Sequence, residues 1–284
     1  MRWEFGRRSD NVEDRRGSRV SGPVVGGGIG AIVLAVIVAL LGGDPNIVLQ
    51  QSGPVSDAPN AGQPSTRNPA EDQTADFVSV VLADTEDTWS QLFRQRGMTY
   101  QEPKLVLFSG AVQSACGYAQ SAMGPFYCPR DRKVYIDLSF FNDLKNRHQA
   151  PGDFAQAYVI AHEIGHHVQN LVGTSGKVQN LQQQVGKTKA NQLSVMLELQ
   201  ADCYAGVWAH HAQKTRQILE QGDVEEALNA ASQIGDDRLQ EQARGYVVPD
   251  SFTHGSSAQR ARWFKRGIQT GELEQCNTFN TGSL

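Results

Sequence analysis

Two histidines and a glutamate stand at the spacing H-E-x-x-H in the middle of the chain, as His162, Glu163 and His166. Residues four apart lie on the same face of a helix, so the two imidazoles can bind one metal ion from a single element. Glu163 would then stand beside the open coordination position, where it could take a proton from a zinc-activated water and return it to a leaving amine. The spacing therefore predicts zinc hydrolase chemistry with Glu163 as the general base.

A catalytic zinc ion takes three protein ligands and keeps one position for water, so a third ligand is expected elsewhere in the chain. The segment 196–206 lacks proline, has apolar residues at helical spacing, and carries Glu198 and Asp202 four residues apart. We expect Glu198 to bind the metal and Asp202 to accept the outer ring N–H of a ligand histidine. The alternative is that both are ordinary charges on a solvated helix face, which the apolar neighbours disfavour.

Other metal-ligand patterns are excluded by position. The longer metzincin pattern needs glycine at position 169 and histidine at position 172, and the chain has Gln169 and Val172 there. His167 points about a hundred degrees away from His166 on a helix, so it is expected to pack rather than to bind metal.

The pairing of H-E-x-x-H with a downstream E-x-x-x-D resembles the gluzincin group of zinc peptidases, and nearly the full chain resembles the bacterial family of neutral zinc metallopeptidases. The resemblance implies an α+β gluzincin-like domain, mainly helical with a small antiparallel sheet, that holds one Zn²⁺ and hydrolyses peptide bonds. The motifs that carry it are M-R-W-E at 1–4, Y-C-P at 127–129, A-H-E-I-G-H-H at 161–167, E-L-Q-A-D-C at 198–203 and H-G-S-S-A-Q-R-A-R-W-F at 254–264.

The resemblance also gives His254 an expected role. Related membrane peptidases carry a His-Pro dipeptide with an arginine six residues after the histidine, and His254 and Arg260 keep that spacing although Gly255 replaces the proline. The implied role of His254 is an electrophilic donor that stabilises the tetrahedral oxyanion. The alternative is that His254 caps the helix that follows it.

The pattern of apolar residues predicts the elements around the site. Residues 75–97 have helical spacing, the runs 104–108 and 133–138 are rich in branched and aromatic residues typical of strands, and the pattern after Ser139 is helical nearly to Arg266. We expect one zinc metallopeptidase domain at 75–284. Its sheet edge at 134–137 is the candidate platform for an extended peptide substrate.

An uncharged, largely apolar run at 22–43 is long enough to cross a bilayer and predicts one transmembrane helix. Six arginines precede the run and no basic residue follows it before Arg67, so we expect residues 1–21 in the cytoplasm and the catalytic domain outside the inner membrane, periplasmic or extracellular. Residues 44–74, rich in Pro, Gly, Asn, Ser and Gln, are expected to form a flexible linker.

Four cysteines follow the apolar run, and none is needed as a metal ligand. A disulfide between Cys116 and Cys128 would close a short loop, and one between Cys203 and Cys276 would tether the C-terminal tail to the proposed ligand helix; the sequence alone allows three pairings, and free thiols are the alternative. The net charge of −4 and the lack of a basic stripe argue against a nucleic-acid partner. The predicted function is that of a membrane-anchored zinc metalloendopeptidase; the alternatives are a non-catalytic zinc-binding module and a hydrolase of other amides, such as cell-wall peptides.

Overall fold

Helices form most of the part of the chain that the structure describes, a computed structural model covering residues 1–17 and 69–280. The eight α-helices of these residues are α3 (Pro69–Gln95), α4 (Ser139–Asn146), α5 (Asp153–Leu171), α6 (Thr174–Gln182), α7 (Lys187–Arg216), α8 (Asp223–Gln233), α9 (Asp236–Arg244) and α10 (Ser257–Thr270). Short 3₁₀ turns lie at Ser121–Met123, Pro249–Ser251 and Leu273–Cys276. The domain is thus α+β and mainly helical, as predicted.

Two small sheets complete the fold. The larger sheet has the order β1 (Val12–Asp14), β2 (Lys104–Phe108), β6 (Lys133–Asp137), β5 (Phe126–Cys128), and the smaller one is the hairpin β3 (Ala111–Ser114) and β4 (Gly117–Gln120). The larger sheet is mixed rather than antiparallel, because β1, β2 and β6 pair in parallel and only β5 runs against β6. The connection at 109–132 is long enough for the crossover that a parallel pair needs.

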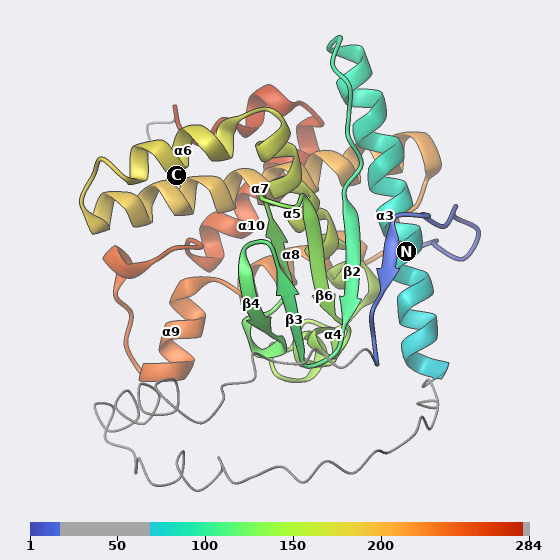
Figure 1. Cartoon of the computed structure of the whole chain (residues 1–284), viewed down its shortest axis with the longest axis horizontal. Helices are drawn as coiled ribbons and strands as arrows, with labels where there is room; N and C mark the ends of the chain where they lie inside the picture. The colour runs from blue at the N-terminus through green and yellow to red at the C-terminus, as the bar shows by residue number, and fades with distance from the viewer. Residues whose placement is uncertain (18–68, 281–284) are drawn as a thin grey trace, which may run out of the picture. The chain divides into compact units, whose positions relative to one another are not determined.

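The side chains of the sheet alternate between two cores. Leu105, Leu107, Val134 and Ile136 join the main core with α3, α5 and α7, whereas Val106, Phe108 and Tyr135 pack under the β3–β4 hairpin. Figure 1 shows α3 beside β2, and α3 also packs against α5 and α7. The sheet therefore separates the hairpin from the helical body.

The predicted substrate edge at Val134–Asp137 is wrong. Strand β6 has a neighbour on each side, β2 and β5, so its backbone groups are already paired within the sheet. The edge strand on this side is β5, which also packs against α5. A run of branched residues identifies a strand but does not say which strand lies at the edge, because that depends on pairing between distant segments.

Residues 1–17, the N-terminal arm, belong to the same compact unit as the main body. Strand β1 extends the sheet beside β2, and Arg7 and Arg8 form ion pairs with Glu86 at 2.9 Å and Asp76 at 2.6 Å on α3. Glu86, with 1% of its surface exposed, also accepts hydrogen bonds from the side chains of Ser9 and Asn11. This differs from the predicted separation of residues 1–21 from the domain, because the arginines find carboxylate partners on α3.

The predicted transmembrane segment 22–43 and most of the predicted linker 44–74 lie outside the described residues. Among the residues that the structure does describe, no helix is long and apolar enough to cross a bilayer. The predicted linker ends too late, since α3 begins at Pro69 rather than at residue 75. Proline suits the first turn of a helix, and the acidic pair Glu71 and Asp72 favours its N-terminal dipole, so the helix extends further back than its apolar spacing indicates.

Candidate metal centre

Helix α5 carries the H-E-x-x-H residues, and a close approach by α7 completes the site. The two helices pack at Gly165, where a Cβ atom would come within 2.9 Å of the Ala201 carbonyl oxygen and 3.0 Å of its Cα. A larger residue at Gly165 would therefore push α7 away. The glycine inside the motif is what allows Glu198, one turn before Asp202 on α7, to reach the histidines.

Three donor atoms converge in the space between these helices. His162 Nε2 lies 3.1 Å from Glu198 Oε2, and His166 Nε2 lies 3.4 Å from Glu198 Oε1. One ligand atom from each residue lies within 4.8 Å of those of the other two. Two imidazole nitrogens and one carboxylate at this separation suit a tetrahedral zinc ion and leave a fourth position open.

Each of the two imidazole rings forms a hydrogen bond through Nδ1. Its Nε2 atom therefore faces the space that it shares with the Glu198 carboxylate. His162 Nδ1 donates to Asp202 Oδ1 at 2.8 Å, the role predicted for Asp202. His166 Nδ1 donates to Gln169 Oε1 at 2.9 Å, and the amide of Gln169 donates in turn to the Leu197 carbonyl at 2.7 Å. Sequence reasoning used Gln169 only to exclude the metzincins; its position three residues after His166 was the available signal. Such partners fix the tautomer of each ligand.

Asp202 is the centre of a buried polar network. Arg260 from α10 donates Nε to Oδ2 and Nη2 to Oδ1, both at 2.9 Å, and the Tyr158 hydroxyl donates to Oδ1 at 2.5 Å. A carboxylate at this depth is tolerated because these donors satisfy it. The network joins α10 to the metal centre. The spacing between His254 and Arg260 did not predict that Arg260 binds Asp202. Tyr158 was missed, although it lies one turn before His162 on the same face.

The carboxylates make the site attractive to a cation. Burial lowers the pKa of His162, but the charges of Asp202 and Glu198 outweigh it and raise the value to about 9. Burial raises the pKa of Glu198, and the two imidazoles oppose it and hold the value well below its ordinary range. In both cases a positive charge between these residues is favoured over a neutral site. A divalent metal ion would supply that charge.

Glu163 lies beside the three donors, where its charge is among those that oppose the effect of burial and raise the pKa of His166. Its side chain is 7% exposed, it lines the same cavity, and it forms no hydrogen bond or ion pair with any described residue. Because it forms no hydrogen bond, its carboxylate is available to a ligand in the cavity. Its place next to the donors is the one predicted for a general base.

His254 lines the cavity from the loop before α10, and Asp236 holds it there. Asp236 Oδ1 lies 3.2 Å from His254 Nδ1, and Oδ2 accepts from the backbone N–H groups of Thr253, His254 and Gly255 at 2.6–3.1 Å. The hydrogen bond to Asp236 raises the pKa of His254, burial opposes this rise, and the charge of Glu198 adds to it. Asp236 was missed, since nothing in its local sequence links it to His254.

The turn at Gly255 explains the missing proline. Gly255 has φ +90°, a left-handed conformation that proline, with φ fixed near −65°, does not adopt. The helix cap is supplied instead by Ser256, whose side chain accepts from the backbone N–H of Gln259. The alternative reading of His254 as the cap of α10 is therefore wrong.

His167 is a packing residue, as expected. It is fully buried between the rings of Tyr100 and Tyr127, donates Nε2–H to the Gln101 carbonyl at 2.6 Å and accepts at Nδ1 from the Tyr127 hydroxyl at 3.0 Å. Burial lowers its pKa to about 4, so the ring is neutral. It anchors α5 to β5 rather than joining the metal donors.

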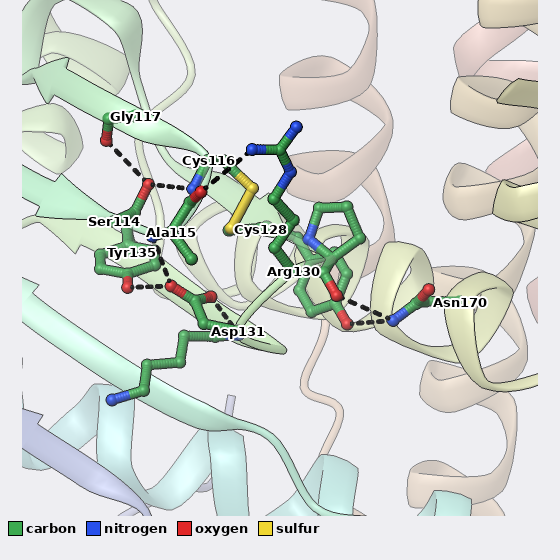
Figure 2. The surroundings of a disulfide bond; sticks show 12 residues. Ser114, Ala115, Cys116, Gly117, Cys128, Arg130, Asp131, Tyr135 and Asn170 are labelled. Atoms are coloured by element: carbon green, nitrogen blue, oxygen red, sulfur yellow. Dashed lines mark hydrogen bonds between the residues drawn. A yellow bond between two sulfur atoms is a disulfide. The ribbon is translucent and has the colours of Figure 1, made fainter.

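Both predicted disulfides are present. Cys203, next to Asp202 on α7, is bonded to Cys276 and ties the C-terminal turn to the ligand helix. Cys116, in the β3–β4 turn, is bonded to Cys128 at the end of β5. Figure 2 shows this second bridge beside Asp131, which accepts from the Ala115 N–H at 2.9 Å.

The donors open into a cavity of about 830 Å³. Its walls come from the segment before β5, from α4, from α6 and α7, and from the loop of His254. This volume is in the range of small-molecule and peptide sites. The metal donors, Glu163 and His254 therefore face one shared space.

Comparison with known proteins agrees with this site. The family model described as "Putative neutral zinc metallopeptidase" matches residues 1–279. The chain is 55% identical to the uncharacterized protein YpfJ of Escherichia coli K12 over 288 residues, covering 98% of this chain and 99% of the relative. It is 40% identical to the uncharacterized protein Rv2575 of Mycobacterium tuberculosis H37Rv over 259 residues, covering 86% of each. No solved structure matches it. With a family model that spans nearly its whole length, the chain belongs to the neutral zinc metallopeptidase family.

Proposed function

We propose that the protein is a zinc-dependent endopeptidase of the gluzincin type. The observation that carries the proposal is the unpartnered carboxylate of Glu163 beside three converging metal donors, His162, His166 and Glu198, in one cavity. A purely structural zinc site closes with four protein ligands and needs no base beside it. An open position with an adjacent carboxylate is what hydrolysis requires.

Glu163 and His254 have separate roles in peptide hydrolysis. When bound, zinc would polarise the scissile carbonyl and lower the pKa of an attacking water. Glu163 takes the proton of that water and returns it to the leaving amine. His254, held in place by Asp236, donates a hydrogen bond to the carbonyl oxygen as negative charge develops on it. No covalent acyl-enzyme is formed.

Strand β5 offers a platform for the substrate backbone. It is an edge strand, it packs against α5, and Phe126 and Tyr127 line the cavity. An extended peptide can add to such an edge through main-chain hydrogen bonds, which are insensitive to side-chain identity. In this proposal β5 binds the extended substrate, the role that was predicted for residues 134–137 of β6.

Metal content and casein hydrolysis of the purified full chain test the proposal. We expect Glu163→Gln to keep one zinc ion and lose at least about a hundredfold in hydrolysis, since the base is removed while all ligands remain. Glu198→Gln should lose zinc. Glu241→Gln on the exposed face of α9 is the matched control and should change neither. Full hydrolysis by Glu163→Gln would overturn the assignment of Glu163 as the base, and a wild-type protein that holds zinc but hydrolyses nothing would leave a structural zinc site as the better interpretation.

A further inference from the structure

One wall of the cavity is made of consecutive small and apolar residues. Every residue from Ser121 to Tyr127 lines it, in the sequence Ser-Ala-Met-Gly-Pro-Phe-Tyr, and Phe140 of α4 joins them. A Cβ at Gly124 would touch the Phe140 ring at 3.6 Å, so the segment lies directly against that ring. We call residues 122–126 together with Phe140 the apolar wall.

Met123 presents its side chain openly on this wall. Its surface is 70% exposed, although a large apolar side chain gains by burial, and no other part of the described chain covers it. The exposed thioether faces the cavity that holds the metal donors rather than an isolated patch of surface. Methionine adapts readily to apolar partners of different shape. An apolar group of a bound ligand would bury the exposed surface of Met123.

The charges nearest the apolar wall are already matched. Asp143 of α4 and Arg147, the residue that follows this helix, also line the cavity and pair with each other at 3.5 Å, while Arg260 is bonded to Asp202. Burial lowers the pKa of His148, which lines the cavity beside them. Within the described residues, the wall therefore offers no unpaired charge for an acidic or basic side chain of a substrate.

Covalent and polar links hold the apolar wall in place. The Cys116–Cys128 disulfide closes a loop that contains the whole segment 122–126. At the start of the segment, the Ser121 hydroxyl donates to Asp137 on β6. At its end, the Phe126 ring stacks on Tyr135 with centroids 4.8 Å apart. Figure 2 shows how the bridge and the Tyr135–Asp131 hydrogen bond of 2.7 Å fix this corner. A subsite on this wall would be preformed, which favours selective binding.

The opposite wall has a different character. Ser175, Gln182 and Ser194 line it, and the Gln182 amide donates to Ser194 Oγ at 2.9 Å and to the Ala190 carbonyl at 3.1 Å. These neutral polar groups bond to one another and give an apolar side chain no partner. The two walls thus distinguish the two sides of a bound peptide.

From these observations we propose that the apolar wall is the subsite that receives a large apolar side chain next to the scissile bond, so that the substrates are peptides carrying leucine, isoleucine, methionine or phenylalanine there. The inference rests on the proposed peptidase function and adds the substrate class to it. Met123 and Phe140 are its specificity-determining residues.

Binding of two small probes to the zinc-loaded full chain tests the subsite without turnover. The probes are N-blocked amino-acid hydroxamates that differ only in their side chain, leucine or aspartate, and their Kd values are measured by calorimetry. We expect the leucine compound to bind about tenfold or more tightly than the aspartate compound, the scale of discrimination by an apolar pocket. Met123→Glu should reduce the ratio to about threefold or less. Met98→Glu, an exposed methionine outside this cavity, is the matched control and should keep the wild-type ratio.

The outcomes separate the subsite from the reaction. Equal Kd values for the two probes, binding of neither probe, or a ratio that Met123→Glu leaves unchanged would each overturn the subsite. Mapping the cleavage sites in casein by mass spectrometry gives the second readout, in which cleavage without regard to flanking residues also contradicts it. A protein that discriminates between the probes but hydrolyses no peptide would keep the subsite and remove the proposed peptidase activity.

Discussion

Replacing Arg260 by methionine should destabilise the domain through Asp202. Methionine keeps much of the volume of the arginine stem but removes two hydrogen bonds of 2.9 Å from a carboxylate that is fully buried. Breaking a buried ion pair by removing one partner costs about 3 to 5 kcal/mol, because the other charge is left uncompensated. Tyr158 and His162 still donate to Asp202, so we expect a loss of about 3 kcal/mol in the free energy of unfolding.

Urea unfolding in the presence of a chelator measures this loss apart from metal binding. The double variant Arg260→Met with Asp202→Asn should recover about 1 to 2 kcal/mol, since the stranded charge is then gone. Arg147→Met is the control, because Arg147 is 74% exposed in its pair with Asp143 and such pairs contribute about 0 to 1 kcal/mol. A loss below about 1 kcal/mol for Arg260→Met, or additive effects in the double variant, would refute the reasoning.

Three further predictions concern residues outside the metal donors. The folded pKa of His167, about 4, lies below its ordinary 6.5, so its contribution is complete above pH 6.5 and falls by about 3 kcal/mol as the pH drops to 4; urea midpoints across this range should fall more steeply for wild type than for His167→Gln. Replacing Cys116 and Cys128 by serine should lower the free energy of unfolding by about 2 to 4 kcal/mol while zinc content stays at one ion, and loss of zinc would contradict the assignment of the bridge to the cavity wall. Deleting residues 2–17 should lower the thermal midpoint because Glu86 loses its partners, and adding Glu86→Gln to the deletion should restore part of the loss; equal midpoints for the deletion and wild type would show that the arm adds nothing.

The parts of the site that the sequence predicted are those set by helical spacing. His162 and His166, and likewise Glu198 and Asp202, each stand four apart on one helix, so each pair could be recognised without knowing the tertiary structure. The residues that were missed reach the site from elsewhere or by a hydrogen bond alone. Asp236 lies on α9 and acts through a loop, and Gln169 joins through its side-chain amide. Such partnerships leave no periodic signal.

For the fold, local patterns predicted the helices and strands but not how the strands pair. The segments 104–108 and 133–137 are strands as expected, yet their parallel pairing and the edge position of β5 depend on contacts between distant residues. The contact of the N-terminal arm with α3 could not be predicted for a related reason. A cluster of arginines has the same composition whether it faces lipid headgroups or carboxylates on α3, and only the fold distinguishes them.

The pairing of β1 with β2 has a consequence for membrane topology. Strand pairing and the Arg7–Glu86 ion pair require contact, so we expect the N-terminal arm and the metal centre on the same side of any bilayer. The charge pattern of the sequence predicts opposite sides instead. Cysteines introduced at Phe5 and Tyr246, both exposed, should therefore react alike with a membrane-impermeant thiol reagent in intact cells, and labelling of one alone would contradict the arrangement. Because carboxylates of α3 match their charges, Arg7 and Arg8 hold the N-terminal arm against the domain, a contact that such a topology would have to preserve.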